Sequence, residues 1–290
     1  MPEQPKIIRR RIRSVSSTKK ITRTMEMVAT AKLKSAQRRV QSSGPYLENL
    51  RLLMAEIGAS GVDVSKWPYF EVRGGKRTLL FVVTANRGLC GGFNTNLVRL
   101  ARTTYRDKER DGHRVRLFVA GKKGISALRF QGFELERTYV DELSDKPTPQ
   151  DAEFFLEELV TPFLAKQVDE VLVVYPHWEN VGRQPPTVLK LLPIVPEGVS
   201  RTTGMPPLFE PSAEEILARL LPLYGRQIIY SVLAEAVASE QVARRIAMKQ
   251  ATDNASDMVT SLTRQYNRAR QALITKEIAE IIGGAEALKK

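Results

Sequence analysis

The chain has 290 residues, 42% of them hydrophobic and 27% charged, a composition typical of globular proteins with room for one or two domains. Its one cysteine, Cys90, excludes an intrachain disulfide and a cysteine-rich metal site. No apolar run approaches the roughly 18 residues that a helix needs to cross a bilayer.

The net charge of +13 is concentrated at the two ends of the chain. Residues 1–51 contain 13 Lys and Arg against 3 Asp and Glu, and residues 226–290 contain 10 against 7. Residues 52–225 contain 22 of each kind, so their net charge is zero. This distribution indicates an acidic partner for the ends only.

A long helix is predicted first, from Lys6 to beyond Val40. Its apolar stripe moves around the helix, which indicates more than one partner. The stripe consists of Ile8, Ile12, Val15, Ile21, Met25, Val28, Leu33, Ala36 and Val40. Pro45 is expected to kink this helix, and the stretch from Gly58 to Gly61 to end it. The Arg-, Ser- and Thr-rich start also resembles a mitochondrial transit peptide, but the helical pattern continues well past a cleavable length.

Short β-rich runs alternate with helical patterns in the middle of the chain, which predicts a small α/β domain with a largely parallel sheet. Strands are expected at residues 79–84, 116–120, 171–175 and 187–192. Helices are expected at residues 94–110, 124–130 and 149–166, the last with Thr148 as its cap and Pro149 at its first position. Residues 195–207 are expected to form a loop that leads to the last helix.

The turn RGLCGGFN, residues 87–94, is the candidate for a phosphate-binding loop. Its spacing matches neither of the common nucleotide-binding patterns, which favours an ordinary turn in which Gly88, Gly91 and Gly92 adopt positive φ and Cys90 is buried. His113 and His177 have no second ligand at metal spacing and no nucleophile nearby. We therefore expect no catalytic residue, no bound metal and no cofactor.

The last predicted element is a helix over residues 226–282, a stretch without Gly or Pro. Its apolar positions are Ile229, Val232, Ala236, Ala243, Ala247, Met258, Leu262, Tyr266, Ala269 and Leu273. A helix of that length would measure about 85 Å, more than the interior of a domain of this size, so it needs a partner along its stripe. The N-terminal helix can supply one by pairing antiparallel to it.

Four stretches closely resemble the gamma subunit of the F-type ATP synthase: residues 17–33, 87–94, 238–255 and 266–288. The resemblance implies a long antiparallel two-helix coiled coil from both termini with an inserted small Rossmann-like α/β domain. The predicted boundaries are residues 1–59 and 208–290 for the helices and 60–207 for the domain. It also implies a non-catalytic central shaft that turns inside the ring of alpha and beta subunits and couples ion flow to ATP synthesis. The domain would lie beside the epsilon subunit on the c ring, at the cytoplasmic side of a bacterial membrane.

Contact residues follow from the same resemblance, position by position. Arg270 and Gln271 match a polar pair that faces a beta subunit, and the segment with Lys20, Arg23, Met25 and Glu26 matches the one near an acidic segment of beta. Ile278, Ile281, Ile282 and Leu288 match the shaft tip in its apolar sleeve, and Phe209 and Glu210 match the foot near epsilon and the c ring. Asn86 stands where the resemblance leads us to expect Asp. The cysteine pair of the chloroplast form has no counterpart.

Two other functional classes compete with this interpretation. Arg9, Arg10, Arg11 and Arg13 are compatible with phosphate contacts in a nucleic-acid-binding protein, although apolar residues interrupt the basic stretch at every turn. A nucleotide-binding enzyme could be built on RGLCGG. The resemblance implies neither nucleic acid nor nucleotide as a ligand of this chain.

Overall fold

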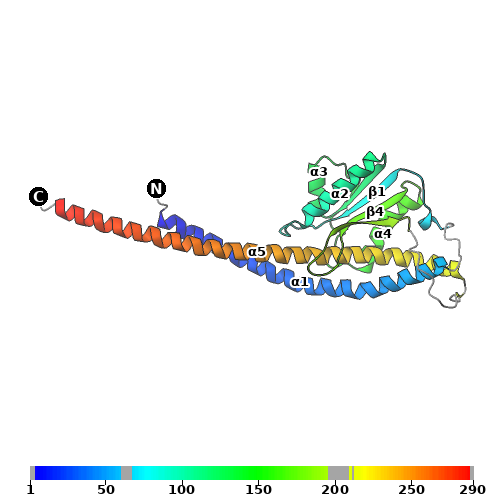
Figure 1. Cartoon of the computed structure of the whole chain (residues 1–290), viewed down its shortest axis with the longest axis horizontal. Coiled ribbons are helices and arrows are strands. Elements are labelled where there is room, and N and C mark those ends of the chain that lie inside the picture. The colour runs from blue at the N-terminus through cyan, green and yellow to red at the C-terminus, as the bar shows by residue number, and fades with distance from the viewer. Residues whose placement is uncertain (1–3, 60–66, 195–208, 211, 288–290) are drawn as a thin grey trace. The chain divides into compact units, whose positions relative to one another are not determined.

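The computed structural model describes residues 4–59, 67–194, 209, 210 and 212–287 (Figure 1). The chain divides into a terminal unit, Met1–Ala29 with Arg244–Lys290, and a central unit, Thr30–Ala243. Two long helices, α1 (Pro5–Ala59) and α5 (Ala213–Ala287), contribute to both units. Every helix in the described part of the chain is too short or too polar to span a bilayer.

The central unit contains a five-stranded sheet in the order β3-β2-β1-β4-β5. The strands are β1 (Arg77–Val83), β2 (Arg114–Ala120), β3 (Arg137–Tyr139), β4 (Glu170–Pro176) and β5 (Pro186–Leu192). The pairs β1–β2, β1–β4 and β2–β3 are parallel, and β5 runs antiparallel to β4. The largely parallel sheet predicted from the sequence is confirmed.

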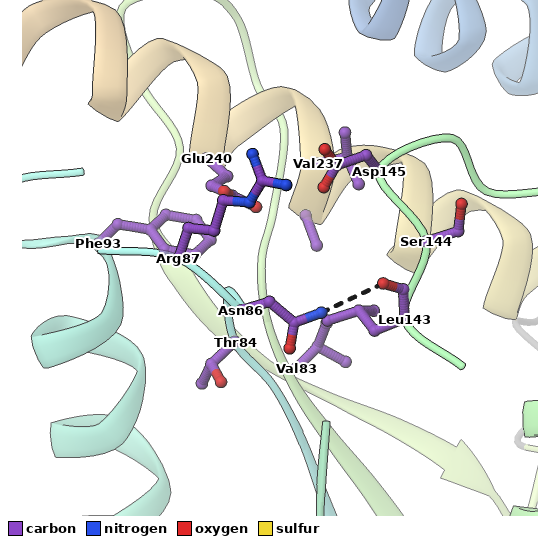
Figure 2. A pocket seen from close by; sticks show the side chains of 11 residues that line it. Val83, Thr84, Asn86, Arg87, Phe93, Leu143, Ser144, Asp145, Val237 and Glu240 are labelled. Atoms are coloured by element: carbon purple, nitrogen blue, oxygen red, sulfur yellow. Dashed lines mark hydrogen bonds between the residues drawn. The ribbon is translucent and has the colours of Figure 1, made fainter. Parts of the chain in front are cut away.

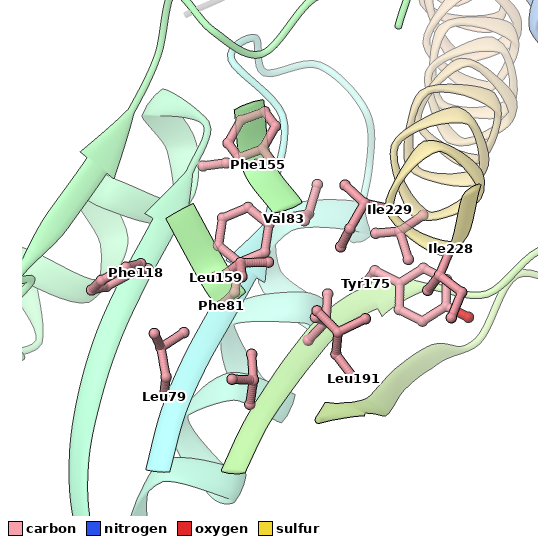
Figure 3. Close-up of a cluster of buried hydrophobic side chains, with 14 of the residues drawn as sticks. Leu79, Phe81, Val83, Phe118, Phe155, Leu159, Tyr175, Leu191, Ile228 and Ile229 are labelled. Atoms are coloured by element: carbon pink, nitrogen blue, oxygen red, sulfur yellow. The ribbon is translucent and has the colours of Figure 1, made fainter. Parts of the chain in front are cut away.

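Helices cover both faces of this sheet because successive side chains of a strand point to opposite sides. Leu79, Phe81 and Val83 of β1 pack with α4 (Pro149–Leu164) and α5 (Figure 3). Leu80 and Val82 pack on the other face with α2 (Phe93–Arg110) and α3 (Lys122–Phe130). The result is a sandwich of three layers with two apolar cores.

Local chemistry explains where the shorter helices begin and end. Thr148 and Asp151 form a reciprocal capping box at the start of α4, as the predicted cap requires. The helix stops before the predicted end at Lys166, which has a φ of 55°. Gly121, at the start of α3, has a φ of 99°, and a Cβ there would lie 2.3 Å from the carbonyl oxygen of Thr84. Only glycine fits this close approach of two loops.

Both long helices pass through residues that usually interrupt helices. Helix α1 continues through Pro45 and ends at Ala59, within the predicted stretch. Helix α5 begins at Ala213 and not at the predicted Arg226, and it includes Pro222. Tertiary packing accounts for this extension, because Leu217, Leu220 and Leu221 are buried against α1 residues such as Leu50. A short 3₁₀ helix, η2 (Pro68–Phe70), adds Phe70 to this cluster.

Candidate functional site: the helix surfaces and the sheet edge

In the terminal unit, α1 and α5 pair antiparallel. The Lys19 Nζ donates to Ser256 Oγ at 3.0 Å, and the Thr22 and Thr252 hydroxyls lie 2.8 Å apart. Residue numbers therefore fall along α5 as they rise along α1. Ala29 and Ala255 are buried in this unit, with relative exposures of 1% and 5%. The antiparallel pairing inferred from the sequence is confirmed here.

The same two helices pair antiparallel in the central unit. Ala36 of α1 packs with Val237 and Ala238 of α5. Further along, the Gln227 Nε2 donates to the backbone oxygen of Ser43 at 3.3 Å. Small residues at these contacts allow the two backbones to approach closely.

The outer face of α1 in the terminal unit combines basic and apolar side chains. Lys20 and Arg23 are exposed, and Met25 and Glu26 are partly buried. Arg23 and Glu26 form an ion pair at 3.5 Å along the helix. Ile21, Met27 and Val28 are also exposed, at 61%, 64% and 51%. Ile21 and Val28 belong to the predicted apolar stripe but are not covered by α5, whereas Thr22 and Ala29 are buried.

The last turns of α5 are uncovered. Every residue from Arg270 to Gly284 is exposed, including Gln271, Ile278, Ile281 and Ile282. Leu273 and Ile274, with exposures of 44% and 46%, extend this apolar surface. Leu273 belongs to the predicted apolar stripe that needs a partner, and Ile274 was not part of that stripe. Leu288 lies outside the described residues, as does the predicted loop over residues 195–207.

The two residues assigned to the foot differ in their surroundings. Phe209 is partly buried and packs against the cluster that contains Leu217 and Leu221. Glu210 is exposed. Phe209 thus anchors the segment before α5, while Glu210 points into solvent.

The turn after β1 is held by side-chain hydrogen bonds. Asn86 Nδ2 donates to the backbone oxygen of Leu143 at 3.3 Å (Figure 2) and to that of Val140 at 3.0 Å. Asn86 Oδ1 accepts from the Lys122 N–H at 3.0 Å. One amide therefore joins three loops at the carboxyl edge of the sheet. Cys90 is 2% exposed, as expected for a small buried side chain.

The backbone of this turn corrects one prediction. Of the three glycines, only Gly91 has a positive φ, 56°, whereas Gly92 has a φ of −80°. Leu89 takes the other left-handed position, with a φ of 61°, and its side chain is 62% exposed. A non-glycine residue in that conformation has no signature in a glycine-based pattern.

Open α/β sheets bind ligands at the carboxyl edge where the strand order reverses, here between β1 and β4. Residues such as Thr84, Asn86, Arg87 and Glu240 line a cavity of about 20 Å³ near this edge (Figure 2). That volume suits one water molecule, whereas ligand pockets measure about 300–1,000 Å³. This cavity is therefore too small for a nucleotide.

The two histidines both contact carboxylate or hydroxyl groups. His113 Nδ1 lies 2.8 Å from Thr78 Oγ1, and His177 Nδ1 lies 3.0 Å from Glu235 Oε2. Burial raises the pKa of the Glu235 carboxyl, and the contacts with Trp178 and His177 oppose that effect. Among the described residues, no three His, Cys, Asp or Glu side chains are grouped to hold a metal ion.

Comparison with known proteins decides the family. The sequence profile of the ATP synthase family matches residues 4–288. The ATP synthase gamma chain of Leptospira biflexa is 39% identical over 287 residues, covering 98% of this chain and 99% of that relative. The gamma chain of Gemmatimonas aurantiaca is 41% identical over 287 residues, with 98% of both chains covered. This chain belongs to the ATP synthase gamma chain family.

Solved structures support the fold of this gamma chain. A chain of the Euglena gracilis mitochondrial ATP synthase matches with a TM-score of 0.69 at 19% identity, covering 98% of the gamma chain and 94% of that chain. A chain from the central stalk and c ring of the Tetrahymena thermophila enzyme matches with a TM-score of 0.62 at 24% identity, covering 80% and 99%. These two likenesses bear on the fold alone. The family membership makes this chain a subunit of ATP synthase and not the catalytic one.

Proposed function

We propose that this gamma chain, the central stalk subunit of ATP synthase, transmits rotation between the membrane sector and the alpha and beta subunits. The observation that carries the proposal is the antiparallel helix pair together with the uncovered end of α5. An exposed apolar surface of this kind needs a partner in the assembled state. The family membership supports a place for that surface inside the catalytic ring.

Three surfaces are proposed to contact the ring. Lys20, Arg23, Met25 and Glu26 would face an acidic segment of a beta subunit, and the exposed Ile21 and Met27 would widen that contact. Arg270 and Gln271 would bind a beta loop through the guanidinium fork and the amide. Ile278, Ile281, Ile282 and Leu288 would turn in an apolar sleeve of alpha and beta subunits.

The proposed mechanism follows from the unequal faces of the helix pair. A shaft that presents basic and apolar residues on one side cannot make the same contacts with every beta subunit at once. Each beta subunit is then biased toward a different conformation, and rotation passes each bias to the next subunit. The gamma chain contributes no catalytic group to this scheme.

A foot that includes Phe209 and Glu210 is proposed to contact the epsilon subunit and the c ring. The helical segments 1–59 and 208–290 would serve as the shaft, and residues 60–207 as the domain beside epsilon. The bacterial origin of the curated relatives supports a peripheral position at the cytoplasmic side of a cell membrane.

Co-purification tests the proposal. The affinity-tagged full chain, expressed in its own cells, is recovered from detergent-solubilised membranes, and the co-purifying proteins are identified by mass spectrometry. We expect alpha, beta, epsilon and c subunits in the same complex. Recovery of the chain without alpha and beta subunits would contradict the proposal.

A further inference from the structure

The hairpin that connects β4 and β5 extends beyond the sheet as a hydrogen-bonded turn. The His177 N–H donates to the Pro185 oxygen at 2.9 Å, and Asn180 and Arg183 exchange backbone hydrogen bonds of 3.2 Å each. The Gly182 N–H also donates to Asn180 Oδ1 at 2.8 Å. These bonds tie the turn to the sheet, so a side chain mounted on it moves with the sheet.

Trp178 lies on this turn and is partly buried within the central unit. It packs against a cluster to which α1 contributes Ala36 and Val40, and α5 contributes Val237 and Ala238. Ala36 and Ala238 are almost fully buried, at 2% and 0%. Because the other members of the cluster are small, the indole is the large apolar group at this crossing of the helices.

Glu235 fixes the position of Trp178. Its Oε2 accepts the Trp178 backbone N–H at 2.8 Å, and the same oxygen lies 3.0 Å from His177 Nδ1. The Glu235 side chain is only 14% exposed, although that of His177 is 45% exposed, so the carboxyl group itself is largely shielded from water. Hydrogen bonds to a carboxylate are stronger than neutral ones, particularly where water is excluded.

We infer that Trp178 is a positioning residue for energy coupling, because it fastens the sheet of the central unit to α1 and α5 at the same point. This inference rests on the proposed rotary function. A bulky residue packed against a cluster that both helices build resists turning of the sheet about the helices and sliding of one helix past the other. The ion pair between Lys32 of α1 and Asp145, at 2.7 Å, holds the domain to the helix less firmly than Trp178 does, since both of its side chains are more than 40% exposed.

The test compares three variants of the assembled complex in inverted membrane vesicles: Trp178→Ala, Trp178→Phe and Phe130→Ala. Phe130 is the matched control, an aromatic residue of the same unit that is 93% exposed. ATP hydrolysis, ATP-driven ion uptake and the amount of assembled complex are measured for each. We expect Trp178→Ala to hydrolyse ATP but to lose most ion uptake per ATP. Trp178→Phe should restore most of that uptake, and Phe130→Ala should match the parent.

Two outcomes would overturn the inference: unchanged ion uptake per ATP in Trp178→Ala, or a parallel loss of hydrolysis and uptake with the ratio preserved. If Trp178→Ala prevents assembly, the variant Trp178→Leu is tested instead, and the same loss of ion uptake per ATP is expected, because leucine is apolar but lacks the bulk of the indole. Failure of the proposed function is distinguishable, because the parent chain itself would then fail to assemble with alpha and beta subunits or to couple hydrolysis to ion uptake.

Discussion

The Thr22 and Thr252 hydroxyls lie 2.8 Å apart, buried between the two helices of the terminal unit. Each hydroxyl also lies near a carbonyl of its own helix, Lys19 for Thr22 at 3.1 Å and Met248 for Thr252 at 2.8 Å. Neither hydroxyl depends on the other to be satisfied. The pair therefore contributes to the register of the helices more than to their stability.

We expect the double replacement Thr22→Val with Thr252→Val to change the free energy of unfolding by less than about 1 kcal/mol. The register should become less specific. The register is measured by disulfide formation in a Cys90→Ser background. One variant combines Lys19→Cys with Ser256→Cys and reports the native register. The other combines Lys19→Cys with Thr260→Cys, one turn further along α5, and reports a shifted register. If the pair Lys19→Cys and Ser256→Cys forms its disulfide with the same preference whether or not the valines are present, Thr22 and Thr252 do not set the register.

Asn86 should not tolerate aspartate. Asn86→Asp removes the donor to the Val140 and Leu143 carbonyls and places a carboxylate beside them. We expect the free energy of unfolding to fall by about 1 kcal/mol or more, because two partly buried carbonyls lose their donor. The measurement is urea unfolding of the full chain.

The matched control for this substitution is Asn94→Asp. Asn94 Oδ1 accepts the Ala85 N–H at 2.9 Å, and aspartate can keep that bond while losing only the weak contact to Cys90 Sγ. The control should therefore lose less stability than Asn86→Asp. Equal losses in the two variants would show that the amide donor of Asn86 has no special role.

Asp169 should make stability depend on pH in the acid range. Its carboxylate accepts Arg77 Nε at 2.9 Å, Arg77 Nη2 at 2.7 Å and the Arg77 backbone N–H at 3.0 Å. Hydrogen bonds from the Arg77 side chain hold the pKa of Asp169 below its usual value. The stability that these hydrogen bonds add is complete above the unfolded-state pKa of Asp169, about 3.9. It is lost as the pH falls through the lower folded-state pKa.

Asp169→Asn should therefore lower stability at neutral pH and flatten its decline in acid. Urea unfolding at a series of pH values from about 2 to 7 measures both effects. Asp111→Asn, an exposed aspartate of the same unit, serves as the control and should leave the acid decline unchanged. A decline in Asp169→Asn as steep as that of the parent would refute this assignment.

Much of the fold could be predicted because its signals are local. The alternation of β-rich runs and helical patterns gave the sheet, and Thr148 with Pro149 marked the start of α4. The three-residue strand β3 was missed, since three residues show no periodicity. The helical pattern missed the first turns of α5, which only the resemblance included. Buried leucines of α1 and α5 stabilise the helix across Pro222, and contacts so distant in sequence leave no local pattern.

The candidate site was less predictable, and for a physical reason. Hydrophobic periodicity assumes that apolar residues are buried within the chain, but Ile21, Val28 and Met258 are exposed. The helix contact uses Thr22, Ala29 and Thr252, which are small or polar. Apolar residues that point to other subunits and those that point to the partner helix give the same sequence pattern. Only the resemblance to a known family suggested which apolar residues point to other subunits and which point to the partner helix.

Arg270 tests the proposed contact with a beta subunit. If its guanidinium binds a carboxylate or carbonyl there, Arg270→Ala removes charge-assisted hydrogen bonds worth about 1.5–3 kcal/mol. Multi-site ATP turnover of the assembled complex should then fall by about tenfold or more. Nucleotide affinity at a single site should change little, because Arg270 is proposed to contact a beta loop and not the nucleotide.

Arg268→Ala is the matched control, since Arg268 is also exposed but lies about 200° around the helix from Arg270. The amount of assembled complex is measured alongside the rate. Unchanged turnover in a fully assembled Arg270→Ala variant would mean that this arginine is only solvated.

The uncovered end of α5 also has a consequence for biosynthesis. Ile274, Ile278, Ile281 and Ile282 are 46%, 52%, 70% and 59% exposed in the isolated chain. A newly made chain that carries such a surface is prone to aggregation until the surface is covered. The cell therefore needs to balance its production against that of the other subunits, or to shield this segment with a chaperone until assembly begins.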